Sequence, residues 1–152
     1  MSVRNIRLLF ALDRRTLLLF FEAFVYLGWA RLLMRRPFAR LAPALGTRTE
    51  ETSTQQTAEH LRLLKQISNA LEAVSRHTLW ESKCLVKAIA GMKMLERRAI
   101  DSTLYLGTAK DERGRLIAHA WLRSGPLYVT GADVMSRFVV VEKFAKRARG
   151  QS

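Results

Sequence analysis

The residues of this chain whose chemistry stands out are its one cysteine, Cys84, and His119, which follows it 35 residues later. Cysteine hydrolases combine these two side chains, because a thiolate attacks the substrate carbonyl and an imidazole accepts the thiol proton. A lone cysteine is more often a small buried apolar residue, and a lone histidine in an apolar run is more often part of the core. The pair therefore predicts covalent catalysis only if the fold brings both side chains to one place.

A helix is predicted to begin near Cys84, because apolar residues recur at helical spacing from 85 to 95. Ser82 is a favourable N-cap residue and would place Cys84 near the second position of this helix. Unpaired backbone N–H groups and the positive end of the helix dipole favour an anion there. The same N–H groups would also hold the oxyanion that forms during acyl transfer.

His119 lies in a predicted strand, residues 116–123, in which successive side chains point to opposite faces. Trp121 shares the face of His119, so it is a candidate substrate-binding residue that would wall the site and exclude water. Plain packing in the core is the alternative for Trp121.

A hairpin is predicted after the histidine strand, because a turn signal at 124–126 precedes the apolar run 127–131. A three-residue turn would pair His119 with Gly131. Asp133 would then lie one diagonal step away on the same face, roughly 7–8 Å from the histidine. Asp133 is therefore the candidate acid that orients the imidazole, with an ordinary turn residue as the alternative.

Several ordered motifs between Trp80 and about Phe144 resemble one family. They are Trp-x-x-x-Cys-Leu-Val, Met-Leu-Glu-Arg-Arg, Leu-Tyr-Leu-Gly-Thr-Ala-Lys and His-Ala-Trp-Leu-Arg. The family is that of the transglutaminase-like cysteine peptidases that mature lasso peptides, and more narrowly its stand-alone leader peptidases. The N-terminal part that ends in Arg-Arg-Pro-Phe at 35–38 is similar as well. The resemblance implies an α+β, papain-like core with a catalytic helix packed on an antiparallel sheet, preceded by an N-terminal helical region.

The resemblance also implies a function, namely removal of the leader from a ribosomally made lasso-peptide precursor before a partner cyclase closes the macrolactam. Cys84 would be the nucleophile and His119 the base. The family's acid falls about where Gly131 stands, so Asp133, a bulge or a backbone carbonyl must orient the imidazole here. The implied partners are the precursor leader, a separate leader-recognition protein and an asparagine-synthetase-like cyclase. The alternatives are an acyltransferase or amidase on the same fold, or a non-catalytic scaffold in the maturation complex.

Composition limits the remaining possibilities. With 152 residues, 49% of them hydrophobic, the chain supports one core, and we expect a docking segment at 1–45 and a protease domain at 46–152. One cysteine excludes an internal disulfide and fits a reducing cytoplasm. The sequence has no cluster of cysteine and histidine residues at metal-ligand spacing, so neither a metal nor a cofactor is expected.

The net charge of +13 is spread along the chain without a nucleic-acid motif, so nucleic acid is not an expected partner. No role is assigned to His60 or His77.

An apolar run at 16–34, with arginine pairs on both sides, is close to membrane-spanning length. Glu22 and Arg31 argue against a span, since each would cost about 2.5–3.5 kcal/mol at the bilayer centre. A helix from about 14 to 36 that docks on the catalytic domain or a partner is expected, with attachment to a membrane surface as the alternative. The remaining elements expected from periodicity and turn residues are a linker at 42–56, a helix at 57–77, strands near 103–110 and 137–141, and a frayed tail from 143.

Overall fold

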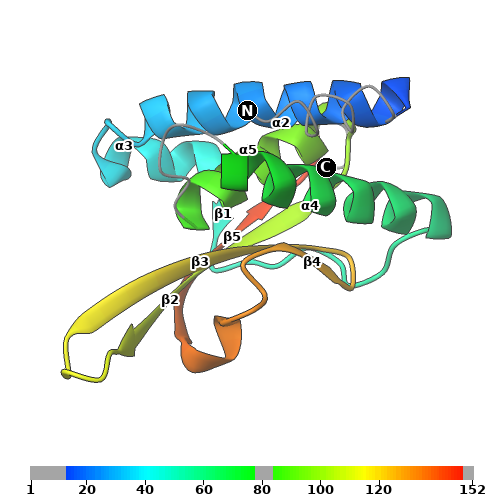
Figure 1. Cartoon of the computed structure of the whole chain (residues 1–152). Helices are drawn as coiled ribbons and strands as arrows, with labels where there is room; N and C mark the ends of the chain where they lie inside the picture. The colour runs from blue at the N-terminus through cyan, green and yellow to red at the C-terminus, as the bar shows by residue number, and fades with distance from the viewer. Residues whose placement is uncertain (1–12, 78–83, 149–152) are drawn as a thin grey trace.

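The computed structural model describes residues 13–77 and 84–148 (Figure 1). Its sheet has five antiparallel strands in the order β1-β5-β2-β3-β4. In chain order the elements are α2 (Arg14–Leu33), α3 (Phe38–Leu41), η1 (Ala42–Leu45), β1 (Thr47–Arg48), α4 (Ala58–His77), α5 (Cys84–Arg97), β2 (Ser102–Lys110), β3 (Leu116–Ser124), β4 (Leu127–Thr130), η2 (Met135–Arg137) and β5 (Val139–Lys146). The predicted α+β class, with an N-terminal helix, is confirmed.

The long helices begin where polar caps satisfy the first backbone N–H groups. Asp13 accepts a hydrogen bond from the backbone N–H of Thr16, and this bond lowers the pKa of the Asp13 carboxyl. Thr57 caps α4 in the same way, since its hydroxyl oxygen accepts the N–H of His60. Ser82, the predicted cap of α5, lies outside the described residues.

The helices form one layer on one face of the sheet, and a single hydrophobic core joins the helices to the strands (Figure 1). α5 is the central element of this layer, because it packs on α2, α4 and the three strands β2, β3 and β4. At Gly91 the helix comes so close to the sheet that an added Cβ would lie 2.9 Å from Leu122 Cδ2. Glycine therefore permits the close contact between α5 and β3.

The two faces of the sheet carry different side chains, as the alternation of the strands requires. Leu104, Ala120 and Leu122 belong to the core beneath the helices. Their neighbours in sequence point to the other face, which the η2 segment covers (Figure 1). The alternation predicted for 116–123 thus separates Leu122 from Arg123 and Ala120 from Trp121 and His119.

Two hairpins join β2, β3 and β4. The turn at 111–115 is as predicted, because Lys110 pairs with Leu116 and Asp111 accepts two backbone N–H groups of the turn. The second turn differs from the prediction. Ser124 pairs with Leu127, so the turn has two residues, and Gly125 adopts the φ of +55° that the tight reversal needs. A register shift follows between Leu122 and Arg123, and the predicted pairing of His119 with residue 131 is wrong.

The C-terminal strand is longer than predicted. β5 continues to Lys146, and Phe144 is fully buried instead of lying in a frayed tail. The predicted linker also contributes a short strand, since Thr47 and Arg48 pair with Ala145 and Phe144. Lysines on both sides of Phe144 and Ala145 concealed the alternation of this strand.

α2 is fixed to the end of α5 by charge as well as by packing. Both Nη atoms of Arg98 donate to the Glu22 carboxylate, at 2.7 and 2.6 Å, and Arg97 lies 3.2 Å from the same group. The Glu22 carboxylate raises the pKa of Arg98. α2 therefore shares the core of the folded chain, while the division at residue 45 and a docking role for 1–45 stay predictions.

Candidate active site

The imidazole of His119 is half-buried and held in one orientation by a backbone carbonyl. Its Nε2 lies 2.8 Å from the carbonyl oxygen of Gly131. A carbonyl only accepts, so the bond assigns the proton of the neutral ring to Nε2, which donates. Nδ1 is then left with a lone pair that can accept a proton, as a general base must.

Gly131 allows this carbonyl to approach the histidine. It has a φ of +75°, and an added Cβ would lie 2.6 Å from the Ala120 oxygen and 3.1 Å from His119 Nε2. The sequence left a backbone carbonyl open as one of three ways to orient the ring. The sequence feature that pointed to a backbone carbonyl was Gly131, which stands where the family has its acidic residue.

Asp133 makes no hydrogen bond or ion pair with any residue in the described ranges. Its side chain is exposed in the turn before η2, while Nε2 of His119 is already bonded to Gly131. No hydrogen bond therefore joins the two residues that were proposed to work together. A catalytic role for Asp133 stays a prediction.

Trp121 is only 4% exposed and lies in a stack of aromatic rings. Its ring centroid is 5.7 Å from that of Tyr105 and 5.8 Å from that of His119, and Phe138 covers His119 at 5.0 Å. Gly107, opposite His119 on β2, leaves room for the indole. Trp121 therefore packs among buried aromatic rings, which was the alternative to substrate binding. Contact between Trp121 and the substrate stays a prediction.

A buried polar network, which the sequence did not reveal, continues from this stack. The Arg123 guanidinium is buried and donates to Tyr105 and to the carbonyls of Thr52 and Gly125. The Tyr105 hydroxyl in turn donates to Glu51 at 2.6 Å. That bond lowers the pKa of Glu51, while burial, followed by the bond to Glu51, raises the pKa of Tyr105.

Cys84 is the first residue of α5 and is half-buried against the core on the helical face. α5 runs in the same direction as β3, because Gly91 lies on Leu122 and Ser124 donates to the carbonyl of Asp101 after the helix. Going back about 10 Å along the helix from Gly91 reaches Cys84, and about 10 Å along β3 from Leu122 reaches His119. The thiol and the imidazole therefore lie at the same end of the sheet.

The Cys84 thiol and the His119 imidazole lie on opposite faces of the sheet at this end. Cys84 packs with the core under the helices, whereas His119 contacts Trp121, Phe138 and Gly131 on the other face. β4 stops at Thr130, opposite Leu122, so the edge of β3 beside His119 has no β4 partner. No hydrogen bond joins the two side chains in this structure, and they can meet only around that edge.

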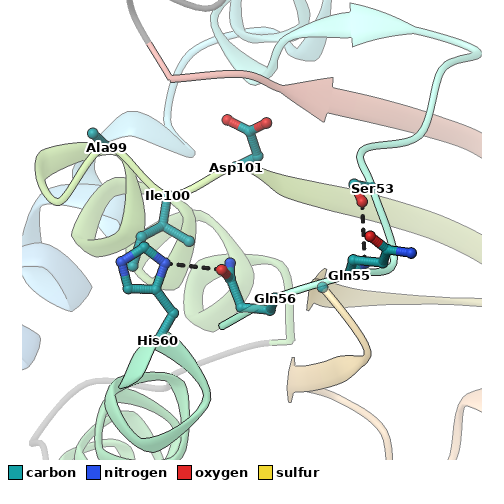
Figure 2. Close-up of a pocket in the computed structure, with 8 residues that line it drawn as sticks. Ser53, Gln55, Gln56, His60, Ala99, Ile100 and Asp101 are labelled. Atoms are coloured by element: carbon teal, nitrogen blue, oxygen red, sulfur yellow. Dashed lines mark hydrogen bonds between the residues drawn. The ribbon is translucent and has the colours of Figure 1, made fainter. Parts of the chain in front are cut away.

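A separate pocket, shown in Figure 2, is lined by neither Cys84 nor His119. It has a volume of about 200 Å³ between the loop before α4 and the chain after α5. His60 Nδ1 is 2.8 Å from Gln56 Oε1 in its wall, and the Asp101 carboxylate already accepts the N–H of Ala148. Within residues 13–77 and 84–148, no three histidine, cysteine or acidic side chains gather to hold a metal ion.

A model of the transglutaminase-like superfamily matches residues 23–143, from within α2 to within β5. The chain therefore belongs to the transglutaminase-like superfamily. This superfamily includes cysteine peptidases and acyltransferases, and its members are typically cysteine-type enzymes. Comparison with curated proteins and with solved structures gave no match.

Proposed function

We propose that this protein is a cysteine peptidase that removes the leader from a lasso-peptide precursor, with Cys84 as nucleophile and His119 as base. The observation that carries the proposal is the bond from His119 Nε2 to the Gly131 carbonyl, which leaves Nδ1 free to take a proton. The position of Cys84 at the start of α5 supports it, because unpaired backbone N–H groups at a helix N-terminus can hold the oxyanion. The substrate class rests on the sequence motifs around these two residues.

In the proposed reaction His119 Nδ1 removes the thiol proton and the Cys84 sulfur attacks the scissile carbonyl. N–H groups of the first turn of α5 hold the oxyanion. The imidazolium, whose Nε2–H is held by Gly131, then protonates the leaving amine, and water hydrolyses the acyl-enzyme. The thiol and imidazole must meet at the open edge of β3, and catalytic hydrogen bonds often tighten only when substrate binds.

The partners follow from the same proposal. The sequence motifs resemble those of stand-alone leader peptidases, which supports a separate recognition protein that presents the precursor and an asparagine-synthetase-like cyclase that receives the product. The net charge of +13 would attract an acidic leader or partner. A reducing cytoplasmic location is part of the proposal, because Cys84 must remain a free thiol.

A non-catalytic scaffold is the second candidate. Two observations favour it, namely that no hydrogen bond joins Cys84 to His119 and that Asp133 makes no hydrogen bond with the imidazole. A scaffold would keep the fold and its docking surfaces without needing these side chains. An acyltransferase would need the same two side chains as the peptidase and differ only in the acceptor.

Replacement of the thiol separates these functions. With precursor and recognition protein present, Cys84→Ala should lower leader cleavage by at least about a thousandfold, measured by mass spectrometry of the products. The melting temperature should change little, since one half-buried sulfur is lost. Iodoacetamide should inactivate the wild type and label Cys84, with the alanine variant as control for labelling elsewhere.

Retained cleavage by Cys84→Ala would contradict the peptidase proposal and leave the scaffold. A small primary amine in the same assay tests the other alternative. If most of the acyl group is transferred to the amine instead of to water, the protein is an acyltransferase.

A further inference from the structure

The outward face of α2 is a continuous strip of exposed apolar side chains. Phe21 is 68% exposed and Leu18 is 61% exposed, although both are large hydrophobic residues. Further along the strip are Val25, Trp29 and Leu32. Their spacing of three or four residues puts them on one side of the helix, opposite the buried residues of α2.

The strip carries positive charge at both ends. Arg14 and Arg15 begin the helix, and Arg35 and Arg36 follow it, all with exposed side chains. Glu22, the acidic residue of α2, is turned toward Arg97 and Arg98 and does not oppose this charge. An apolar surface with arginines at each end complements a layer of hydrocarbon bordered by anionic headgroups.

α2 is long and apolar enough to cross a membrane. The core helices of soluble proteins and signal sequences can have the same length and apolar composition. One face of α2 contributes Leu19, Ala23, Leu27 and Ala30 to the core, while most of its other apolar side chains are not buried. Its inner face is nonetheless fixed to the domain through Leu27, Ala30 and the paired Glu22. A span would break those contacts, whereas a helix lying in the plane of the interface would keep them.

The strip fits lipid better than another protein. Protein interfaces carry about one hydrogen bond per 100–200 Å². Between Arg15 and Arg31 the exposed apolar side chains offer one polar group, the indole N–H of Trp29. Tryptophan at the border between apolar and charged groups is typical of the membrane interface.

We propose that the outward face of α2 binds the surface of an anionic lipid bilayer, with the apolar strip in the acyl region and the flanking arginines on the phosphates. The folded domain then remains on the aqueous side. The proposal stands on the exposed strip and its charges alone, so it holds whether or not Cys84 is a nucleophile.

The test is flotation of the full chain with vesicles of equal parts phosphatidylglycerol and phosphatidylcholine. Wild-type protein should float with these vesicles and much less with phosphatidylcholine alone, and salt should release it because exposed charges are screened. The double variant Phe21→Ser with Leu32→Ser should lower partitioning by at least about tenfold. Trp29 should be quenched by brominated acyl chains, and the quenching should be lost in Trp29→Phe.

The matched control is Val139→Ser with Val141→Ser, which removes two exposed apolar side chains from β5. It should bind like the wild type, and the melting temperatures of all variants should agree. Equal binding to phosphatidylcholine alone would overturn the anionic part of the proposal. No flotation, or a dimer in solution that depends on Phe21 and Leu32, would overturn the whole proposal and make α2 a protein contact.

Discussion

The two faces of the sheet are held by different forces. On the helical face, Cys84, Leu122 and their neighbours pack in an apolar core, beside which one hydrogen bond runs from Ser68 of α4 to the Val129 carbonyl of β4. On the other face, His119 is fixed by a backbone carbonyl, a stack of rings and, further along, the buried Arg123 network. The hydrophobic layer positions the proposed nucleophile, and directional contacts position the proposed base.

This difference predicts how substitutions on each face of the sheet affect stability and turnover. Apolar packing tolerates small shifts, because dispersion contacts are numerous and individually weak. A stack and a single hydrogen bond depend on direction, so a shift of one ring changes where the histidine proton points. Substitutions on the helical face should therefore act mainly on stability, and substitutions on the His119 face mainly on turnover.

The largest effect is expected at His119. His119→Ala should lower turnover on the precursor by about a hundred- to ten-thousandfold, the usual range for a general base. Asp133→Asn is the matched variant, and since Gly131 already binds Nε2 its turnover should stay within about threefold of wild type. Single-turnover cleavage measures both. A loss of orders of magnitude in Asp133→Asn would show that this aspartate is the orienting acid.

A smaller effect is expected from adding one methyl group on each face. An alanine at Gly107 would place its Cβ 2.8 Å from the Trp121 ring and 3.0 Å from Phe138 Cβ, so the stack on His119 must move. Turnover of Gly107→Ala should fall about ten- to hundredfold, as for misplaced catalytic groups.

Gly91→Ala is the counterpart on the helical face. Its Cβ would meet the flexible ends of Leu122 and Leu71, and the higher helix propensity of alanine, about 1 kcal/mol, offsets this crowding. Its turnover should stay near wild type. Turnover distinguishes the two variants, and melting temperatures measured beside it show that each variant is folded. An equal loss of turnover in both would show that the faces do not differ as proposed.

The smallest effect is expected on stability at low pH, through Glu51 of the Arg123 network. The bond from Tyr105 lowers the pKa of Glu51 in the folded chain, so the ionised carboxylate contributes stability above its usual value of 4.5 and loses it as pH falls. The side chain is 46% exposed, so the contribution should be no more than about 1 kcal/mol. Between about pH 7 and pH 3 the melting temperature of Glu51→Gln should fall by a few degrees less than that of wild type.

Glu50→Gln, which removes the neighbouring carboxylate, is the control for general charge effects. It should follow the wild-type curve. Parallel curves for wild type and Glu51→Gln would mean that the network on the His119 face is not sensitive to this carboxylate.

The sequence by itself determined the local elements, because their causes are local. Periodicity placed α4 and α5, alternation put Trp121 on the face of His119, and the turn at 111–115 followed from its own residues. The arginine-flanked apolar run of α2 was also visible. Superfamily membership agrees with the motifs around Cys84 and His119.

Only the tertiary structure decided which distant groups meet. Glu22 and Arg98 are 76 positions apart, and neither helix alone contains a reason for their pairing. The Gly131 carbonyl reaches His119 because a two-residue turn and a register shift bring it there, and backbone atoms carry no mark in the sequence. Phe144 is recognisable as a strand residue only once β1 and β2 lie on either side of it. Such contacts depend on how the chain closes in space, which local propensity does not encode.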